Sequence, residues 1–437
     1  MQKNNLSRRQ FLTTSAVGLA GITIIPSFMS CQPKAKKDNL IKLGFIGMGR
    51  QAMFLLNGFI QIPGVRVVAG SDVYGRKRTR FEKFVNDFYA KNKIDIKVTA
   101  TEKYEDVLAR EDVDAVVIAI PDHSHAMVAI NALRAGKDVY LEKPLTFTIY
   151  EGQQLIKVVR ENDRILGVGS QQRSDPNFQH AVKMAQEGKL GNIEKVYAYV
   201  GAPPTPYDLP EEPIPSDLNW DRWLGPLPGS IHFNNELNPP ISLDPVEHET
   251  IWGAWRWYKE MGGGFTTDWG AHMFDIAQWG LSMDKNGPVE ISPLGEEFIQ
   301  YKYASGAIMT SEPFNEIKTK GVKFIGSKGW IEVSREHYLA SDASLNPTVQ
   351  GKKDDMPYET RVPHQINFIE AVRKHIDPIV PVEIGHSSCT VCTLGNIAVD
   401  LGRTIYWNPA TQTFKDDNDG SAAAKMHYKY RNGWKLM

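Results

Sequence analysis

The stretch that decides the fold lies at residues 41–52 and reads Ile-Lys-Leu-Gly-Phe-Ile-Gly-Met-Gly-Arg-Gln-Ala. Its first six residues are an apolar run typical of a buried strand, and the Gly-x-Gly-x-x-Ala pattern then predicts a tight turn and a helix over residues 52–59. The first N–H groups of such a helix are unpaired and lie at the positive end of its dipole, so they favour a phosphate group. We therefore expect a dinucleotide to place its pyrophosphate against Gly47, Met48, Gly49, Arg50 and Gln51.

A glycine-rich turn also caps helices in unrelated α/β proteins, so its context has to decide between the two interpretations. Short apolar segments alternate here with helical patterns such as residues 126–135. This alternation predicts a parallel sheet with helices on both faces. The expected strands are residues 41–46, 65–69, 115–120, 138–141 and 165–168.

An acidic residue follows the second expected strand. Asp72 stands 23 residues beyond Gly49 (72 − 49), which is the separation expected of a carboxylate that binds the adenosine ribose. A carboxylate at this position repels a 2′-phosphate, so we expect NAD as the cofactor. Arg76 and Arg78 follow closely and keep NADP as the less favoured alternative.

The character of the chain changes after about residue 193, where the apolar segments become typical of a mostly antiparallel sheet. The expected strands are residues 196–200, 298–303, 307–311, 321–325 and 330–333, and helical patterns follow at 365–374 and 387–405. A stretch rich in Pro, Trp and Asn occupies residues 202–245. It is too long for an ordinary connection, so we expect it to be a functional loop region.

The fold class that we predict is α/β followed by α+β. Residues 40–165 form a Rossmann domain, a doubly wound parallel sheet that binds NAD(P). Residues 166–437 form a substrate-binding and oligomerisation domain with a large, mostly antiparallel open sheet.

Residues 1–31 are typical of an export signal, and a polar linker follows at residues 32–39. Residues 7–12 read Ser-Arg-Arg-Gln-Phe-Leu and begin an apolar stretch that ends at Ile25, as in twin-arginine signals. We expect export by the twin-arginine route to the periplasm. Residues 28–31 read Phe-Met-Ser-Cys, which resembles a bacterial lipobox, so Cys31 is either lipidated or close to a simple cleavage site.

The formal net charge of the 437-residue chain is −1, which gives no electrostatic reason to expect binding to nucleic acid or to an anionic membrane surface. We expect small-molecule partners instead. No cysteine cluster has metal-binding spacing, and no metal is expected. Cys389 and Cys392 form either a redox or disulfide pair, or two small core residues of a buried helix. The helical spacing of their apolar neighbours favours the second interpretation.

Two local patterns carry groups suited to chemistry. Glu142, Lys143 and Pro144 follow an expected strand, at the edge of the sheet where ligands bind, although a surface salt bridge is the alternative.

The second pattern follows a glycine triplet at residues 262–264. On a helix, Asp268, His272 and Asp275 share one face, because they are four and three residues apart. Such a face predicts a histidine held between two carboxylates. A structural helix terminus and a metal site are the alternatives, and the nucleotide fold favours acid/base catalysis.

Several aromatic and basic residues precede the triplet: Trp252, Trp255, Arg256, Trp257 and Tyr258. Exposed rings at this position can stack on a sugar ring, and packing beneath an irregular loop is the alternative. Arg256 and Tyr258 are therefore candidate substrate contacts.

Four motifs of the chain, in their order, resemble those of the Gfo/Idh/MocA family of oxidoreductases. They are the Gly47 turn, residues 120–125 (Ile-Pro-Asp-His-Ser-His), the Glu142-Lys143-Pro144 triplet, and the pair Asp268 and His272. This family is named after glucose-fructose oxidoreductase, inositol dehydrogenase and a rhizopine-catabolism protein. The resemblance covers nearly the whole chain after the signal. Within residues 120–125, Ile120 and Asp122 depart from the Thr-Pro-Asn-x-x-His pattern of the family.

The resemblance implies roles for individual residues. Lys143 would contact the reacting hydroxyl and lower its pKa, His272 would act as the general acid/base, and Asp268 would hold the substrate or orient His272. The cofactor contacts that it implies are Pro121, His125, Glu142, Lys143 and Gln171, and Arg173 is a further candidate substrate contact. Members of the family commonly form dimers or tetramers, so we expect a homo-oligomer.

We therefore expect an exported NAD-dependent oxidoreductase that takes hydride from a secondary hydroxyl of a sugar, polyol or glycoside, with a tightly bound cofactor. The alternative is an NAD-dependent glycosidase that resembles glycoside hydrolase family 109, in which oxidation, elimination and reduction leave no net redox change. A carbohydrate-binding module without activity is a third possibility, and the intact Lys143, Asp268 and His272 argue against it.

Overall fold

Six parallel strands form the sheet of the N-terminal part, in the order β3-β2-β1-β4-β5-β6. The structure, a computed structural model, describes residues 40–347, 361–431 and 433–436. The strands are β1 (Ile41–Ile46), β2 (Val65–Ser71), β3 (Ala100–Thr101), β4 (Ala115–Ile118), β5 (Asp138–Leu141) and β6 (Leu166–Val168). Every residue of β4, β5 and β6 is buried, as expected of a sheet with helices on both faces. The predicted doubly wound parallel sheet is confirmed.

The helices that alternate with these strands are α1 (Arg50–Phe59), α2 (Gly75–Lys91), α3 (Tyr104–Leu108), α4 (Asp122–Arg134) and α5 (Ile149–Glu161). α4 begins four residues before the predicted start at residue 126, and the strand before it ends at Ile118. Its polar first turn hides its beginning in the sequence. Pro121, in an extended conformation, precedes that turn, and the acid Asp122 within it suits the positive end of the helix dipole.

A nine-stranded sheet forms the second half, in the order β13-β12-β11-β7-β10-β9-β8-β14-β15. Its strands are β7 (Ile193–Tyr199), β8 (Glu290–Leu294), β9 (Phe298–Lys302), β10 (Ile308–Thr310), β11 (Gly321–Gly326), β12 (Gly329–Ser334), β13 (Tyr338–Ala340), β14 (Ile405–Asn408) and β15 (Thr413–Lys415). Neighbouring strands pair antiparallel in the described part of this sheet, except that β7 and β10 are parallel. The predicted, mostly antiparallel sheet is confirmed, with β8 added inside it and the short strands β13, β14 and β15 added toward its edges.

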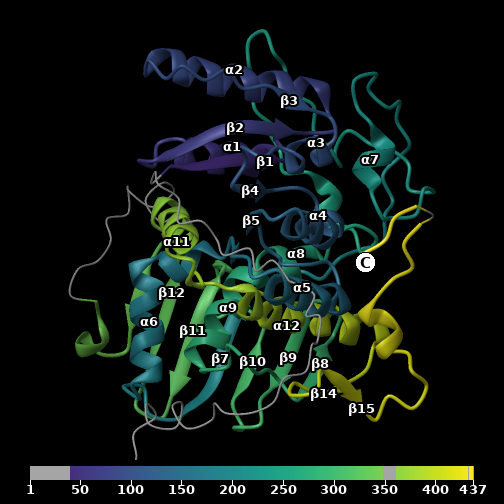
Figure 1. Ribbon diagram of the computed structural model, residues 1–437. Coiled ribbons are helices and arrows are strands. Elements are labelled where there is room, and N and C mark those ends of the chain that lie inside the picture. The colour runs from purple at the N-terminus through teal and green to yellow at the C-terminus, as the bar shows by residue number, and fades with distance from the viewer. Residues whose placement is uncertain (1–39, 348–360, 432, 437) are drawn as a thin grey trace, which may run out of the picture. The chain divides into compact units, whose positions relative to one another are not determined.

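Three helices pack against this sheet, as Figure 1 shows: α6 (Pro176–Gln186), α9 (Gly270–Gly280) and α12 (Val382–Leu401). The other α-helices among the described residues are α7 (Trp220–Leu224), α8 (Gly264–Asp268) and α11 (Arg361–Lys374). α12 was predicted at residues 387–405, but it begins at Val382 and ends before Gly402, whose φ of 61° stops it.

Both cysteines of the Cys-x-x-Cys pattern are buried and free on α12. Cys389 Sγ donates a hydrogen bond to the Thr146 carbonyl oxygen at 3.0 Å, and burial raises the pKa of Cys389 to about 11. Their interpretation as small core residues is confirmed.

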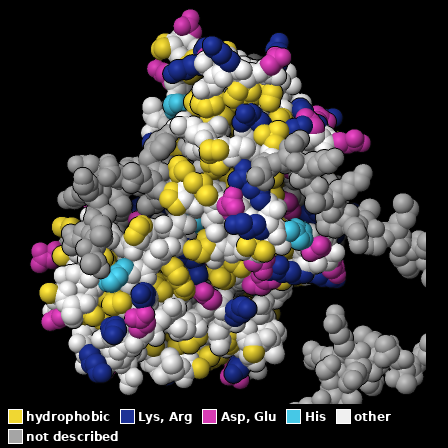
Figure 2. Space-filling view, turned by 60° about the vertical axis from the view of Figure 1, so that its left-hand side comes forward, with side chains coloured by type: hydrophobic (Ala, Val, Ile, Leu, Met, Phe, Trp, Pro, Cys, Tyr) yellow, Lys and Arg dark blue, Asp and Glu magenta, His cyan; other side chains and the backbone are white. Residues whose placement is uncertain are grey.

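Among the described residues, no helix is both long and apolar enough to cross a membrane. The predicted export signal, the linker at residues 32–39 and Cys31 lie outside the described residues. Figure 2 shows one face of the molecule, on which Lys and Arg side chains are interspersed with Asp and Glu.

Candidate active site

A cavity of about 500 Å3 lies where the carboxyl ends of the parallel strands meet α8 and α9. Ligands bind at this edge of doubly wound sheets. The sequence-predicted residues that line the cavity are Gly47, Gly49, Arg50, Gln51, Asp72, Pro121, Glu142, Lys143, Gln171, Arg256, Asp268 and His272. The predicted nucleotide and catalytic groups therefore face one space.

The glycine turn has the geometry that a pyrophosphate needs. Gly47 has a φ of 86°, and a Cβ there would lie 2.3 Å from the carbonyl oxygen of Ala119. Gly49 precedes α1, which has no side-chain cap and no acid in its first turn. A Cβ on Gly49 would meet only Glu249 Oε1, at 3.9 Å, so there is space in front of the helix. These residues fit a bound phosphate group.

Met48 was expected to contact the cofactor, but it does not line the cavity. Its side chain is fully buried in the core. Its N–H group donates to Asp72 Oδ2 at 2.7 Å, so this group holds the acid rather than the pyrophosphate.

Asp72 lines the cavity at the end of β2, as predicted for the ribose-binding acid. Its other oxygen accepts from the Tyr74 N–H group at 2.8 Å. Burial raises the pKa of Asp72, although Lys77 and the two N–H groups lower it. Each carboxylate oxygen retains a lone pair for a ribose hydroxyl.

The two arginines that kept NADP as an alternative are engaged elsewhere. Arg76 lies 3.8 Å from the carboxylate of Asp217, and Arg78 donates to the Asp72 carbonyl oxygen at 2.6 Å. Neither residue lines the cavity. This arrangement agrees with the preference for NAD.

The predicted functional loop region continues to residue 257 and packs against the nucleotide domain; we call residues 202–257 the covering segment. Glu249 pairs with Arg80 at 2.8 Å and with Lys77 at 3.1 Å, both from α2. Burial raises the pKa of Glu249, but Lys77 and Arg80 outweigh burial and lower this pKa to about 2. Glu249 is therefore a carboxylate that pairs with both cations.

Asn238 of the covering segment also lines the cavity. Its Oδ1 accepts from Lys77 at 2.6 Å, whereas its buried Nδ2 has no hydrogen-bond partner among the described residues. A buried donor without a partner is costly, so this amide supports a ligand in the nucleotide half of the cavity.

At the other end of the cavity, Lys143 joins the two domains. Its Nζ lies 2.8 Å from Asp268 Oδ1 and 2.9 Å from the Asp268 carbonyl oxygen. Arg256 Nε is 3.6 Å from the same carboxylate. Burial opposes ionisation of Asp268, but Lys143 and Arg256 lower its pKa, so it is a carboxylate.

His272 lies in the first turn of α9 and is buried, with its ring edge-on to Trp269 at 5.9 Å. The amide of Gln172 is oriented by Arg335, whose guanidinium donates to the amide oxygen at 2.8 and 2.5 Å; the amide nitrogen is then 2.5 Å from His272 Nδ1. In this orientation the Gln172 amide donates to Nδ1 and fixes the orientation of the ring.

The expected histidine between two carboxylates is not formed. Trp269 separates α8 from α9, so Asp268 and His272 belong to different helices. Asp275 is fully buried and accepts from Ser388 Oγ at 2.6 Å and from Arg173. It is a structural anchor of α9.

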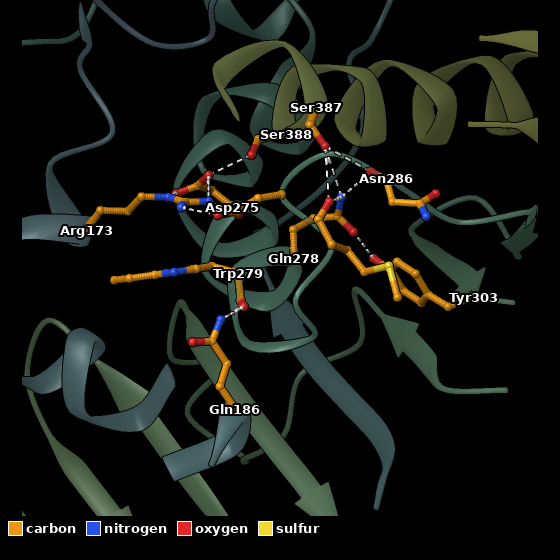
Figure 3. A network of polar contacts seen from close by, with 11 residues as sticks. Arg173, Gln186, Asp275, Gln278, Trp279, Asn286, Tyr303, Ser387 and Ser388 are labelled. Atoms are coloured by element: carbon orange, nitrogen blue, oxygen red, sulfur yellow. Dashed lines mark hydrogen bonds and ion pairs between the residues drawn. The ribbon is translucent and has the colours of Figure 1, made fainter. Parts of the chain in front are cut away.

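Arg173 was predicted to contact substrate, but the structure does not bring it to the cavity. Figure 3 shows its guanidinium against Asp275; it donates twice to this carboxylate, at 2.8 Å each, and also to Asp284 at 3.0 and 2.7 Å. The Trp279 ring lies 4.8 Å from the guanidinium carbon. Arg173 holds α9 in place.

Two further candidates also lie outside the cavity lining. His125 is buried in α4, and its ring nitrogens lie 2.8 and 2.9 Å from the carbonyl oxygens of Pro144 and Ile120. Burial lowers its pKa to about 4, so the ring is neutral and positions the segment that carries Lys143. Tyr258 is buried and packs edge-on against Tyr207 at 5.1 Å.

Other side chains complete the site and were not among the predicted contacts. Asp122 is buried in the first turn of α4 and lines the cavity; burial raises its pKa to about 8, although Arg256 and Lys143 lower it. Lys320 and Arg335 reach the cavity from the nine-stranded sheet. Only the departure of Asp122 from the family pattern marked any of the three in the sequence.

Aromatic rings form the wall around Asp268. They belong to Trp252, Trp255, Trp257, Phe265 and Trp269. Arg256 stacks on Trp255 with 4.3 Å between its guanidinium carbon and the ring centre. The alternative of packing beneath a loop holds for Tyr258 and Trp255, which are buried in one core cluster, whereas Trp252 is exposed. No group of three His, Cys, Asp or Glu side chains suited to a metal ion occurs in the part of the chain that the structure describes.

Relatives in sequence include a glycosyl hydrolase family 109 protein of Saccharopolyspora erythraea, 27% identical over 261 residues. The match covers 56% of this chain and 55% of that protein, so the chain spans about half the length of the curated relatives that it matches.

Solved structures of similar fold include the WlbA dehydrogenase from Bordetella pertussis in complex with NADH and UDP-GlcNAcA, with a TM-score of 0.60, 18% identity and coverage of 84% of this chain and 98% of that one. Scyllo-inositol dehydrogenase from Lactobacillus casei with bound NAD(H) and scyllo-inositol has a TM-score of 0.56 and 16% identity over 84% and 99% of the two chains.

Two family models match most of the described chain. Residues 41–170 match the oxidoreductase family, NAD-binding Rossmann fold, and residues 196–436 match the oxidoreductase family, C-terminal alpha/beta domain. The chain belongs to the Gfo/Idh/MocA family of oxidoreductases, with an NAD-binding Rossmann domain at its N-terminal end.

Proposed function

We propose that the protein is an NAD-dependent oxidoreductase that acts on a secondary hydroxyl of a sugar, polyol or glycoside. One observation carries the proposal: Lys143, Asp268 and His272 line the same cavity as the N-terminus of α1, which has no side-chain cap. When bound, NAD supplies the hydride acceptor. The aromatic wall around Asp268 suits the apolar face of a sugar ring.

The roles of the three polar residues follow from their hydrogen bonds. Lys143 donates to the reacting oxygen and stabilises its negative charge, while Asp268 holds the ammonium group in place. His272 is the general acid/base: the neutral ring takes the proton of the reacting hydroxyl when an alcohol is oxidised, and the protonated ring returns it when a carbonyl is reduced. These are general acid/base and electrostatic roles, and they need no metal.

We also propose that the cofactor is bound tightly and that the enzyme is exported. The covering segment supports tight binding, because Glu249, Asn238 and Arg50 tie it to the nucleotide domain; Arg50 donates to the Thr250 carbonyl oxygen at 3.2 Å. The sequence of residues 7–12 supports export. An enzyme outside the cytoplasm gains from keeping its cofactor. Lipidation of Cys31 and assembly into a dimer or tetramer remain parts of this proposal.

The family 109 relatives favour a second candidate, an NAD-dependent glycosidase. Oxidation of a ring carbon acidifies the neighbouring C–H bond, and elimination releases the aglycone and leaves a double bond. Water adds to this double bond, and reduction of the carbonyl then gives the free sugar. The same Lys143 and His272 serve both reactions, since both begin at a secondary hydroxyl. No net redox change occurs, which suits a retained cofactor.

One experiment tests both candidates. The purified protein is denatured, any released nucleotide is identified, and glycosides and free sugars are assayed for NADH and for aglycone. Net NADH supports the dehydrogenase, and aglycone without NADH supports the glycosidase. Finding neither bound nucleotide nor affinity for NAD would contradict both.

Lys143→Met distinguishes an enzyme from a binding module. We expect turnover to fall by roughly a hundredfold or more, because the group that stabilises charge on the reacting oxygen is lost. Lys157→Met is the control, since Lys157 is exposed on α5 and its ion pair with Glu161, at 3.8 Å, is exposed as well. Sugar affinity that persists in Lys143→Met without any activity in the wild-type protein would support the binding module.

A further inference from the structure

The cofactor cavity is lined at one point by a tryptophan from a remote part of the chain. Trp434 stands 99 residues beyond Arg335, the preceding lining residue (434 − 335). It belongs to residues 427–431 and 433–436, which we call the tail segment and which form neither helix nor strand. Figure 1 shows this segment in yellow, near α4 and α7. The tail segment therefore returns from the nine-stranded sheet to the cofactor cavity.

Arg431 joins the tail segment to the covering segment. Its Nε donates to the Gly225 carbonyl oxygen at 2.6 Å, and its Nη1 donates to the Asp221 carboxylate at 2.6 Å. Its backbone N–H group donates to the Pro226 carbonyl oxygen at 3.1 Å. The Trp434 N–H group donates in turn to the Arg431 carbonyl oxygen at 3.2 Å. Arg431 therefore fixes the turn that carries the tryptophan.

Further anchors on both sides of Trp434 reach the nucleotide domain. Before it, Tyr430 Oη donates to Glu151 Oε1 of α5 at 2.5 Å. After it, Leu436 is 7% exposed and belongs to the buried apolar cluster that includes Val128 of α4. The tail segment is therefore an ordered wall of the nucleotide domain.

α7 brings the tail segment to one particular end of the cavity. Arg222 lines the cavity, and its guanidinium carbon lies 5.8 Å from the ring centre of Tyr104. The neighbouring Asp221 holds Arg431, whose guanidinium carbon lies 5.8 Å from the ring centre of Trp434. Two consecutive residues of α7 thus place Tyr104 and Trp434 in the same part of the cavity.

Tyr104 identifies this part as the adenosine end. It is the first residue of α3, just after β3, and it lines the cavity. The Asp72 N–H group donates to the Thr101 carbonyl oxygen of β3 at 3.1 Å, so α3 begins beside the acid that is expected to bind the adenosine ribose. Lys143 lies at the other end of the cavity. The adenine of a dinucleotide is attached to that ribose, so it belongs near Tyr104.

The exposed part of the Trp434 ring suits this purine. Both Trp434 and Tyr104 are half-buried, so each ring keeps surface that a ligand can cover. Aromatic side chains stack on bases because every base has a flat π-face. The other parts of the cofactor have different partners, since the pyrophosphate is expected at α1 and the nicotinamide near Lys143.

We propose that the tail segment is a latch on the cofactor and that Trp434 contacts the adenine ring of NAD. Arg431 and Leu436 keep the indole ring in place. The latch is separate from the contacts of Glu249, which hold the covering segment to α2. The inference deepens the proposed tight binding of the cofactor and rests on the proposed function.

The test compares two ligands that share the adenine ring. NAD or ADP-ribose, which has no nicotinamide, is loaded on the purified full-length protein, and its release is followed after dilution into a trap for the free ligand. Trp434→Ala should accelerate the release of both by the same factor, roughly ten- to a hundredfold, because the lost contact is with the part that they share.

Three further variants test the mechanism of the latch. Trp434→Phe should release both ligands nearly as slowly as the wild-type protein, because a phenyl ring also stacks on adenine. Arg431→Met should accelerate release several-fold, because it frees the segment from Asp221 and Gly225. Trp330→Ala is the matched control and should change neither rate, because Trp330 is a half-buried ring on β12 that does not line the cavity. Thermal unfolding without nucleotide confirms that each variant is folded.

Three results would overturn the inference: unchanged release of both ligands in Trp434→Ala, faster release of NAD with unchanged release of ADP-ribose, or equal acceleration in Trp434→Ala and Trp434→Phe. If Trp434→Ala does not fold, unchanged release in Arg431→Met overturns it as well. The proposed function fails in a different way: Trp434→Ala would accelerate the release of NAD, but the wild-type protein would form neither NADH nor aglycone from any sugar or glycoside.

Discussion

The carboxyl group of Asp122 has an unusual charge state for a residue that faces a cavity. Burial raises its pKa to about 8, while Arg256 and Lys143 lower it and Asp268 and Glu142 raise it. At neutral pH it therefore holds a proton and can donate a hydrogen bond to a ligand. An asparagine has a similar shape and can donate as well, but it cannot titrate.

This raised pKa makes the free energy of unfolding depend on pH. The unfolded chain loses the Asp122 proton near pH 4, whereas the folded chain keeps it up to about pH 8. Between these values the folded state binds more protons, so the Asp122 contribution to stability falls as the pH rises. We compare urea titrations of Asp122→Asn and the wild-type protein, both without nucleotide. Between these pH values the free energy of unfolding should fall less in Asp122→Asn than in the wild-type protein, and the difference between the two decreases should reach up to several kcal/mol.

Asp112→Asn is the control for this prediction. Asp112 is exposed, and the side-chain hydrogen bond from Arg110 lowers the pKa of Asp112. The contribution of Asp112 to the free energy of unfolding is therefore lost only as the pH falls. Parallel stability curves for the wild-type protein and Asp122→Asn between about pH 4 and pH 8 would contradict the prediction.

At the scale of elements, α9 depends on one buried arginine. Arg173 is 1% exposed and spans Asp275 of α9 and Asp284 beyond it, and Ser388 of α12 completes the network. Removing one partner of a buried ion pair leaves the others without compensation, which is far more costly than losing an exposed pair.

We therefore expect Arg173→Met to lower the free energy of unfolding by about 3–5 kcal/mol in urea titrations. Arg160→Met should cost about 1 kcal/mol or less, because Arg160 is 43% exposed and its partners Asp377 and Glu383 remain solvated. If Arg173 bound substrate instead, stability would stay unchanged and KM alone would rise.

At the scale of the whole molecule, the covering segment joins the two domains across the cofactor cavity. Its ion pairs with α2 are buried, and its hydrogen bond from Arg50 lies next to the glycine turn. The pKa of Glu249 is about 2, below its ordinary value of 4.5. The contribution of Glu249 to the free energy of unfolding is therefore fully present above pH 4.5 and is lost only as the pH falls through about 2.

We expect Glu249→Gln to release NAD faster by roughly tenfold or more, because Lys77 and Arg80 lose their buried partner. The release rate is measured by dilution into a trap for free NAD, and it should stay constant between mild acid and neutral pH. Asp377→Asn, which removes an exposed pair, should leave the rate unchanged. An unchanged rate in Glu249→Gln would show that the segment does not retain the cofactor.

Local patterns explain which parts of the architecture could be predicted. Apolar runs and the Gly47 turn identify the parallel sheet, since a buried strand needs apolar residues on both faces and the turn needs a positive φ. The short edge strand β15 was not predicted, because it is mostly exposed and has no apolar alternation. The start of α4 was missed because its first turn is polar.

The sequence by itself determined the parallel and the mostly antiparallel sheet, the glycine turn and the candidate catalytic groups, because these depend on patterns within a few neighbouring residues. Tertiary structure alone decided which side chains face the cavity. Arg173 and His125 follow strand ends but point into packed networks, whereas Lys320 and Arg335 reach the site from a distant sheet. Such outcomes depend on the packing of segments far apart in the chain, and no local pattern records that packing.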